Sequence, residues 1–303
     1  MKKVDNIFHR TTCRLCGGKD LTLALKLAPS PLPDAYVPVE DADKPQPLFP
    51  LNLFLCRGCG FSQLLDVVLP GAIYTYYLYE TKSSLGLVDH FKQYADEVLD
   101  RIQPARGSLV VDIGSNDGTL LSFFKKRGRR VLGIDPAVEI ARKATGSGLE
   151  TLPALFTFEL SQRIKREWGP ATIITANNLF ANVDDLTDLT RGIRELLAPD
   201  GVFIFESSYC VDMIQNMIFD FIYHEHLSYF SVKPLNTFFH EQGMEIIDIQ
   251  RISTKGGSLR YTVQLAGGPR AVSGSVAEFI ELERRMAPDN WKFSTILPEG
   301  STA

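Results

Sequence analysis

The sequence predicts an α/β protein with a Rossmann-like sheet, preceded by a cysteine-containing module and followed by a short α+β extension. From residue 108 onward, short apolar runs next to turn residues alternate with helical stretches, as in parallel sheets that are covered by helices. Before residue 70, two CxxC pairs flank a proline-rich segment. Such a segment cannot form a helix.

The apolar runs define the expected elements and their grouping. Strands are expected over 109–113, 131–134, 172–176 and 202–205, and in the extension over 245–252 and 258–265. Helices are expected near 84–102 and 234–242. We divide the chain into the module (1–70), an aromatic segment with a linking helix (71–107), the Rossmann-like domain (108–220) and a substrate-covering extension (221–303).

Composition limits the class of protein. The 303 residues carry a net charge of −4 and are 45% hydrophobic, which is typical of a soluble globular protein. Because there is no basic footprint, a nucleic-acid partner is not expected. No apolar run reaches the ~18 residues of a membrane helix, and no signal region precedes the module. We therefore expect a cytoplasmic protein without a membrane partner; its oligomeric state is not indicated.

The spacing of four cysteines predicts a metal site. Cys13 and Cys16 form one CxxC turn, and Cys56 and Cys59 form the second. Two such turns supply four thiolates to one tetrahedral ion, which suits Zn²⁺ and leaves no open position, so the zinc is expected to be structural. Four free thiols or a redox pair are the alternative. Cys210 is interpreted as a buried thiol.

A polar, glycine-bearing turn between the first predicted strand and helix predicts a nucleoside cofactor. It lacks the G-x-G-x-x-G spacing, and its carboxylates would repel the pyrophosphate of a dinucleotide. S-adenosylmethionine carries cationic groups and no phosphate, so it fits better; the alternative is a packing turn. The D-x-G-x-N-x-G pattern also resembles the first motif of class I S-adenosylmethionine-dependent methyltransferases. The predicted cofactor residues here are Asp112, Gly114, Asn116, Asp117 and Gly118, with Asp135, 21 residues past Gly114, for the ribose hydroxyls.

Two further groups are candidates for ligand contact. Asn177 and Asn178 follow the strand over 172–176, at the sheet edge where ligands bind. Both are predicted to contribute to the cofactor site, since asparagines there can bind backbone or substrate; the alternative is that one of them serves only as a helix cap. Leu155 and Phe156 either flank the adenine or pack in the core.

The segment 223–230 concentrates groups that can transfer protons. It contains Tyr223, His224, Glu225 and His226 in a chain with five histidines. One histidine can act as a general base, with the glutamate fixing its tautomer and a tyrosine stabilising an oxyanion. A surface or core cluster without catalytic function is the alternative.

Together, these motifs resemble the zinc-containing sugar C-methyltransferases. That family uses S-adenosylmethionine to branch nucleotide-activated 4-keto-deoxysugars at carbon 3. The matching stretches are the two CxxC pairs, the tyrosine-rich segment before residue 80, and residues 111–118, 175–178, 223–226 and 255–260. The resemblance implies a class I methyltransferase sheet and a small-molecule partner, a nucleotide-sugar.

The resemblance also implies roles for individual residues. His226 is the expected base, Glu225 and Tyr223 assist it or bind the sugar, and Tyr77 or Tyr79 closes over the substrate.

The chain departs from the family in two places. Asn182 stands near a position where the family has histidine. The chain is also expected to be truncated or reduced before a further lobe that holds the nucleotide diphosphate. Lys255 and Arg260 are then phosphate contacts or solvated surface charges.

Two other functions remain open. An O- or N-methyltransferase acting on a related small molecule has the same cofactor site. A non-catalytic protein that binds zinc and the cofactor, having lost catalysis with the sugar-nucleotide lobe, also fits the motifs.

Overall fold

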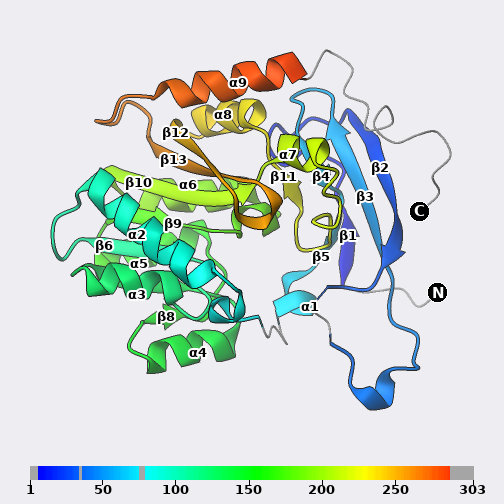
Figure 1. Ribbon diagram of the computed structural model, residues 1–303, viewed down its shortest axis with the longest axis horizontal. Helices are drawn as coiled ribbons and strands as arrows, with labels where there is room; N and C mark the ends of the chain where they lie inside the picture. Colours follow the sequence, from blue (N-terminus) through cyan, green and yellow to red (C-terminus); the bar gives the residue numbers. More distant parts are fainter. Residues whose placement is uncertain (1–5, 34–35, 75–78, 287–303) are drawn as a thin grey trace.

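The structure is a computed structural model that describes residues 6–33, 36–74 and 79–286 (Figure 1). Its centre is a seven-stranded sheet with the strand order β12-β13-β10-β9-β6-β7-β8. The strands are β6 (Leu109–Ile113), β7 (Arg130–Ile134), β8 (Thr151–Leu152), β9 (Ala171–Thr175), β10 (Leu197–Ser208), β12 (Met244–Ile252) and β13 (Ser258–Leu265). Among these strands, β13 alone runs in the opposite direction to the others, and it pairs antiparallel with both β10 and β12. The predicted parallel sheet is therefore mixed at one edge, and both strands of the extension belong to it.

Successive residues of the central strands belong to two separate hydrophobic cores, one on each face of the sheet, because side chains alternate between the faces of a strand. Val110 and Ile173 pack with helices α2 and α3 on one face. Val111 and Ile174 pack with α5, α6 and α8 on the other face. The helices are α1 (Pro70–Tyr74), α2 (Leu87–Ile102), α3 (Thr119–Lys126), α4 (Val138–Gly146), α5 (Phe158–Trp168), α6 (Leu186–Leu196), α7 (Cys210–Gln215), α8 (Val232–Glu241) and α9 (Gly274–Met286).

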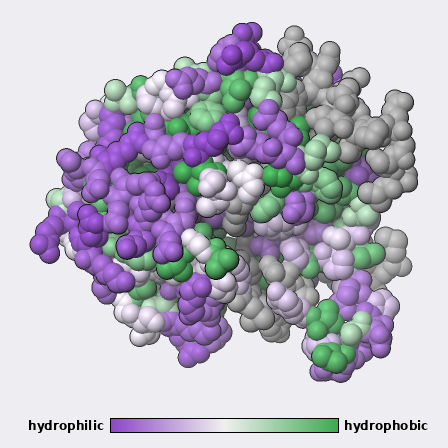
Figure 2. Space-filling model, viewed as in Figure 1, coloured by the Kyte–Doolittle hydropathy of each residue, from purple (hydrophilic) through white to green (hydrophobic). Residues whose placement is uncertain are grey.

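Helix α2 illustrates how the sequence determines an element. Its apolar side chains face the sheet, and Figure 2 shows hydrophilic residues covering the outer side of α2 and α3. The helix ends at Ile102 because Gln103 adopts a left-handed conformation (φ 50°) and Pro104 follows it. The predicted end of this helix is thus confirmed. Within the described residues, no helix is both long enough and apolar enough to cross a membrane.

The N-terminal module is built around a second sheet with the order β11-β4-β3-β2. Strands β2 (Leu21–Ser30), β3 (Phe49–Cys56) and β4 (Ser62–Leu64) come from the module, whereas β11 (Ser228–Tyr229) follows the Rossmann-like domain. Strands β1 (Ile7–His9) and β5 (Asp66–Val68) pair beside it. The proline-rich segment connects β2 to β3, and its described part has one short 3₁₀ turn, Val39–Asp41. The module and the central domain therefore share a sheet, although they are far apart in sequence.

A buried carboxylate attaches the C-terminal helix α9 to the rest of the fold. Glu283 accepts hydrogen bonds from the backbone amides of Val232 and Lys233, at the start of α8. The hydroxyl of Tyr209 donates to the same carboxylate at 3.0 Å. A carboxylate at a helix N-terminus pairs amide groups that the helix itself leaves unpaired. Glu283 therefore joins α9, α8 and the end of the central sheet.

Glu283→Ala should lower the free energy of unfolding by about 2 to 4 kcal/mol, because three buried donors lose a charged acceptor. Chemical denaturation followed by circular dichroism measures this change. Glu281→Ala on the same helix is the control, since Glu281 pairs with exposed arginines and its loss should cost less than about 0.5 kcal/mol. Equal effects of the two substitutions would contradict the assigned role.

Candidate functional site

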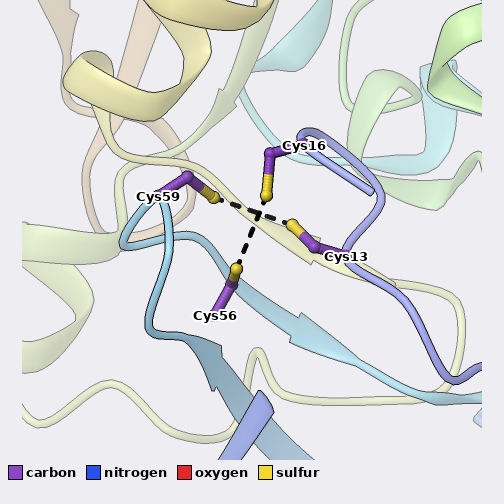
Figure 3. A group of neighbouring side chains, drawn as sticks. All are labelled: Cys13, Cys16, Cys56 and Cys59. Carbon is purple, nitrogen blue, oxygen red and sulfur yellow. Dashed lines mark hydrogen bonds between the residues drawn. The ribbon is translucent and has the colours of Figure 1, made fainter. Parts of the chain in front are cut away.

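The four predicted metal ligands converge on one point between the two CxxC turns (Figure 3). The Sγ atoms of Cys13 and Cys59 lie 3.7 Å apart, and those of Cys16 and Cys56 lie 3.6 Å apart. A tetrahedral site with zinc–sulfur bonds of about 2.3 Å has sulfur–sulfur edges of about 3.8 Å. The four thiols therefore fit a zinc ion with no open coordination position.

The two turns share one backbone conformation, which explains the glycine after each pair. The amide of Gly17 donates to the carbonyl of Cys13 at 3.0 Å, and the amide of Gly60 donates to that of Cys56 at 2.8 Å. Both glycines have left-handed φ values, 69° and 82°, which side chains disfavour.

The pKa values of the thiols reflect their crowding. Contact with Cys59 lowers the pKa of Cys13 to about 5, while the same contact raises the pKa of Cys59. Four thiolates this close repel one another unless a cation lies between them. Cys210 lies elsewhere and is buried, which confirms the interpretation as a buried thiol, and desolvation raises its pKa to about 12.

A cavity of about 340 Å³ lies at the carboxyl ends of β6, β7 and β9. This is the sheet edge where α/β proteins bind ligands. Its lining includes most of the predicted cofactor residues and the predicted catalytic segment. These are Asp112, Gly114, Asn116, Asp135, Asn177, Asn178, Tyr223, Glu225 and His226.

The turn after β6 requires glycine at two positions. Gly114 has φ +73°, and a Cβ atom there would lie 2.6 Å from Leu179 Cδ1. Gly118 has φ +75°, and its Cβ would lie 2.6 Å from Leu149 Cδ1. Gly114 lines the cavity, whereas Gly118 is not among the lining residues. The contact of Gly118 with the cofactor therefore stays a prediction, while its packing role is visible.

Asn116 and Asp117 hold a second segment against this turn. Asn116 Oδ1 accepts from the amide of Thr81 at 2.8 Å, and Asn116 Nδ2 donates to the carbonyl of Tyr79 at 2.8 Å. Asp117 Oδ2 accepts from the amide of Lys82 at 3.2 Å. Asn116 lines the cavity and Asp117 does not. Segment 79–82 is thereby fixed as part of the cavity wall, and cofactor contact by Asp117 stays a prediction.

Two buried carboxylates lie at the ends of β6 and β7. Asp112 accepts a hydrogen bond from Thr175 Oγ1 at 2.6 Å, and desolvation, with a smaller contribution from Asp135, raises its pKa to about 7. Asp135 accepts from the amides of Asn116 (2.8 Å) and Ala137 (2.9 Å), and burial raises its pKa. Each carboxylate oxygen of Asp135 retains a second lone pair. Asp135 can therefore still accept from ribose hydroxyls.

The asparagines after β9 provide the test of whether the cavity suits a polar cofactor. Asn182 Oδ1 has no hydrogen-bond partner among the described residues, and neither amide atom of Asn177 makes a hydrogen bond of normal geometry there, although the Tyr94 hydroxyl interacts with the Asn177 side chain. A buried polar atom without a partner costs about 1 to 3 kcal/mol. These groups therefore favour a ligand with polar atoms, such as the amino-acid part of S-adenosylmethionine. Asn178 lines the same wall, and its backbone N–H donates to the backbone carbonyl of Glu206 at 2.9 Å.

Leu155 and Phe156 both line the cavity, although they differ in environment. Phe156 packs against the core, where a Cβ at Gly192 would lie 2.8 Å from its ring. Leu155 is 51% exposed, so core packing does not explain it. An apolar pair at this place can flank a flat base such as adenine.

The predicted catalytic segment enters the cavity wall with a defined histidine tautomer. His226 Nδ1 lies 3.2 Å from the carbonyl of Phe221, and a carbonyl only accepts, so Nδ1 carries the proton. His226 Nε2 is then the basic nitrogen, and the hydroxyl of Tyr223 lies 2.8 Å from it. Glu225 lines the cavity as well. The roles of all three residues stay predictions.

The neighbouring histidine is placed differently. His224 is buried, its Nε2 lies 3.3 Å from the carbonyl of Phe49, and it is not a lining residue. Tyr79 lines the cavity, whereas Tyr77 lies outside the described residues.

Arg260 corrects an expectation from the sequence. It was expected to contact phosphate or to be a solvated surface charge. Instead it is 5% exposed and pairs with Glu206 at 2.8 Å and Glu97 at 2.7 Å. A buried guanidinium held by the buried carboxylate of Glu206 and the exposed carboxylate of Glu97 supports the fold at this edge of the sheet, so neither expectation is correct.

The sequence reasoning missed two charged residues near the cavity. Asp184 lines it and accepts from Arg14 Nε at 2.9 Å and from Arg10 at 3.0 Å. Burial lowers the pKa of Arg14 to about 10, although the Asp184 charge opposes this shift. Both CxxC pairs contain arginine at the same position, so the sequence offered no signal that one of them is buried.

The strand order, the glycine turn after β6 and the acidic residue after β7 define the class I fold of S-adenosylmethionine-dependent methyltransferases. Residues 88–249 match the family described as "Methyltransferase domain", and residues 13–74 match "Putative zinc binding domain". The first match covers more than half of the chain, which therefore belongs to the methyltransferase-domain family. The predicted enzyme class, its cofactor and the zinc-binding module are thereby confirmed.

Known proteins resemble the chain over different lengths. C-methyltransferase NovU from Streptomyces niveus is 35% identical over 272 residues, which are 90% of this chain and 65% of NovU. The ubiquinone biosynthesis O-methyltransferase of Paracidovorax citrulli is 27% identical over 36% of this chain and 47% of its own length. An S-adenosylmethionine-dependent methyltransferase structure from Clostridium acetobutylicum has 14% identity and a TM-score of 0.46, over 59% of this chain and 92% of its own. The chain thus spans less than two thirds of either sequence relative.

Purified protein should contain one zinc ion per chain, because the four thiols fit a closed tetrahedral site. Cys56→Ser should lose most of the metal and expose the remaining thiols to titration. Cys210→Ala is the matched control and should retain a full equivalent. Elemental analysis with thiol titration measures both quantities, and a metal-free wild type with four reactive thiols would contradict the site.

Asp112→Asn should change how stability depends on pH. The unfolded carboxyl ionises near pH ~4 and the folded one near pH 7, so the folded state holds an extra proton between these values. The Asp112 contribution to the free energy of unfolding therefore falls as pH rises through this window, by about 4 kcal/mol. Denaturation between pH 4 and pH 8 without cofactor should show that the free energy of unfolding of the variant increases relative to that of wild type as pH rises. A constant difference would refute the shifted pKa.

Proposed function

We propose that the protein is an S-adenosylmethionine-dependent C-methyltransferase that acts on a nucleotide-activated keto-deoxysugar. The observation that carries this proposal is the Tyr223–His226 pair, which lines the same cavity as the cofactor turn. The similarity to a protein named C-methyltransferase supports methylation at carbon. The small-molecule substrate and the cytoplasmic location belong to the same proposal.

The first step is removal of a proton from the carbon next to the ketone. A ketone makes this C–H bond acidic, and a base then forms an enolate. His226 Nε2 is the candidate base because Nδ1 is committed to the carbonyl of Phe221. The Tyr223 hydroxyl, 2.8 Å from Nε2, can stabilise the enolate oxygen or pass the proton.

S-adenosylmethionine, when bound, would supply an electrophilic methyl group to the enolate carbon; its sulfur–methyl bond would break as the carbon–carbon bond forms, and S-adenosylhomocysteine would leave as the product. Asp135 would accept hydrogen bonds from its ribose hydroxyls, and the Asn177 side chain would bind its polar amino-acid part. Holding both reactants in one cavity raises their effective concentration and aligns them for reaction. The zinc ion, with four thiolate ligands, takes no part in the chemistry.

Asn182 stands near a position where the resembling family has histidine. Its Oδ1 atom is buried in the lining and has no partner among the described residues. An amide oxygen can accept a hydrogen bond from a substrate hydroxyl or amino group, although it cannot take up a proton near neutral pH. Proton transfer in this protein therefore depends on the 223–226 segment.

Methylation of oxygen or nitrogen is the second candidate function, and the similarity to an O-methyltransferase over 36% of the chain favours it. Incubation with methyl-¹³C-labelled cofactor and a panel of nucleotide-activated 4-keto-deoxysugars separates the candidates. A carbon-bound methyl signal in the NMR spectrum supports our proposal. A methyl group on oxygen or nitrogen supports the second candidate, and no transfer supports a non-catalytic binding protein.

His226→Asn should lower the turnover number by about 10² to 10⁴, because a general base is lost. Cofactor affinity, measured by calorimetry, should stay within about twofold, since the binding residues are unchanged. The variant should also lose exchange of the substrate's α-proton with deuterated solvent when no cofactor is present.

The control is His224→Asn, one position before Glu225. His224 does not line the cavity, so this variant should retain both exchange and turnover. A His226→Asn protein that methylates at the wild-type rate would show that another group is the base.

A further inference from the structure

The side chain of Arg14 leaves the first CxxC turn and reaches the cavity wall. Its guanidinium is fully buried, with 0% of the side chain exposed. Nε donates to Asp184 Oδ1 at 2.9 Å. Nη1 donates to the carbonyl of Leu64 and to Gln63 Oε1 at 3.1 Å, and it approaches the carbonyl of Leu227 at 3.4 Å. One side chain thus contacts the module's sheet, the lining of the cavity and the residue that follows His226.

The second CxxC turn shows that the metal site itself does not need a buried arginine. Arg57 occupies the same position between Cys56 and Cys59, in a turn with the same backbone hydrogen bond, and it is exposed. Burying a cation costs several kcal/mol unless partners compensate for it. The burial of Arg14 is therefore explained by the groups it contacts outside the metal turn.

These contacts fix the backbone on the carboxyl side of His226. The carbonyl of Leu227 accepts from the amide of Leu64 at 2.9 Å in addition to Arg14, and the amide of Leu227 donates to the carbonyl of Ala181 at 2.9 Å. Strand β11 then continues from this residue by pairing with β4. The proposed base is thereby held between the zinc module and the 180–182 turn.

We propose that Arg14 is a positioning residue through which zinc binding sets the placement of His226 and Asp184 at the cavity. Zinc fixes Cys13 and Cys16, and so fixes the backbone of Arg14 between them. The guanidinium passes this constraint to Leu227 and Asp184. The inference rests on the proposed function only for the role of His226 as base, because the contacts exist in any case.

The experiment compares wild type, Arg14→Gln and Arg57→Gln as full chains by NMR with ¹⁵N-labelled histidine. The His226 signal is assigned through its loss in His226→Asn. Asp184 keeps its pair with Arg10 at 3.0 Å, so Arg14→Gln leaves no unpaired carboxylate. If that variant does not fold, Arg14→Lys, which keeps the charge but not the forked geometry, takes its place.

We expect both variants to retain one zinc ion per chain, with the His226 resonance shifted in Arg14→Gln and unchanged in Arg57→Gln. Chelation of zinc should shift the His226 resonance of wild type and add no comparable change in Arg14→Gln. In turnover assays, kcat of Arg14→Gln should fall by about 10- to 100-fold through misplacement of the base. Its cofactor affinity should stay within about twofold.

An unchanged His226 resonance in the Arg14 variant, or equal shifts in both arginine variants, would overturn the inference. Loss of zinc from folded Arg14→Gln would also overturn it, because Arg14 would then serve the metal turn itself. A wild type that methylates no keto-sugar would refute the proposed function, whereas the resonance still decides the role of Arg14.

Discussion

The pairing of β11 with β4 is the constraint on which the candidate site depends. It brings the chain back to the cysteine module after the central domain, with Ser228 opposite Gln63 and Tyr229 opposite Ser62. The segment with Tyr223 and His226 ends at this pairing, so its place at the cavity is determined by a sheet to which the module contributes three strands. The cysteine module therefore forms one support of the candidate site.

The sequence predicts those parts of the fold that depend on local pattern. The apolar run over 109–113 and the strand over 258–265 have the predicted bounds, and the CxxC spacing identified four thiols that meet in space. Strand β8 has two residues and no periodicity, so no pattern could reveal it. The partners of Arg260, Glu97 and Glu206, come from α2 and β10, and nothing in the local sequence brings them together. Contacts between distant segments are thus what the sequence did not disclose.

Residues of the turn after β6 line the cavity or hold the 79–82 segment in place, and the sequence alone could not show which residue does which. Asn116 and Asp117 were both interpreted as cofactor ligands, and the side chains of both bind the 79–82 segment. Both side chains therefore help to build the wall of the cavity, whereas of the two only Asn116 also lines it. By contrast, Asp112, Asp135 and Asn177 line the cavity with polar side chains that do not bind the 79–82 segment. Residues of the same chemical type in one motif can therefore have different functions.

Because β11 comes late in the sequence, it also affects how the chain folds during synthesis. Residues 13–59 can close the cysteine cluster early in synthesis, because all four ligands are then available. The free edge of β4 meets its partner only after residue 229 has left the ribosome, so the module has an unpaired strand edge in the interval. Such an edge, beside the apolar side chains of Leu53 and Leu64, is a template for pairing with other chains. The segment that completes the wall of the cavity is thus also the one that covers this strand edge.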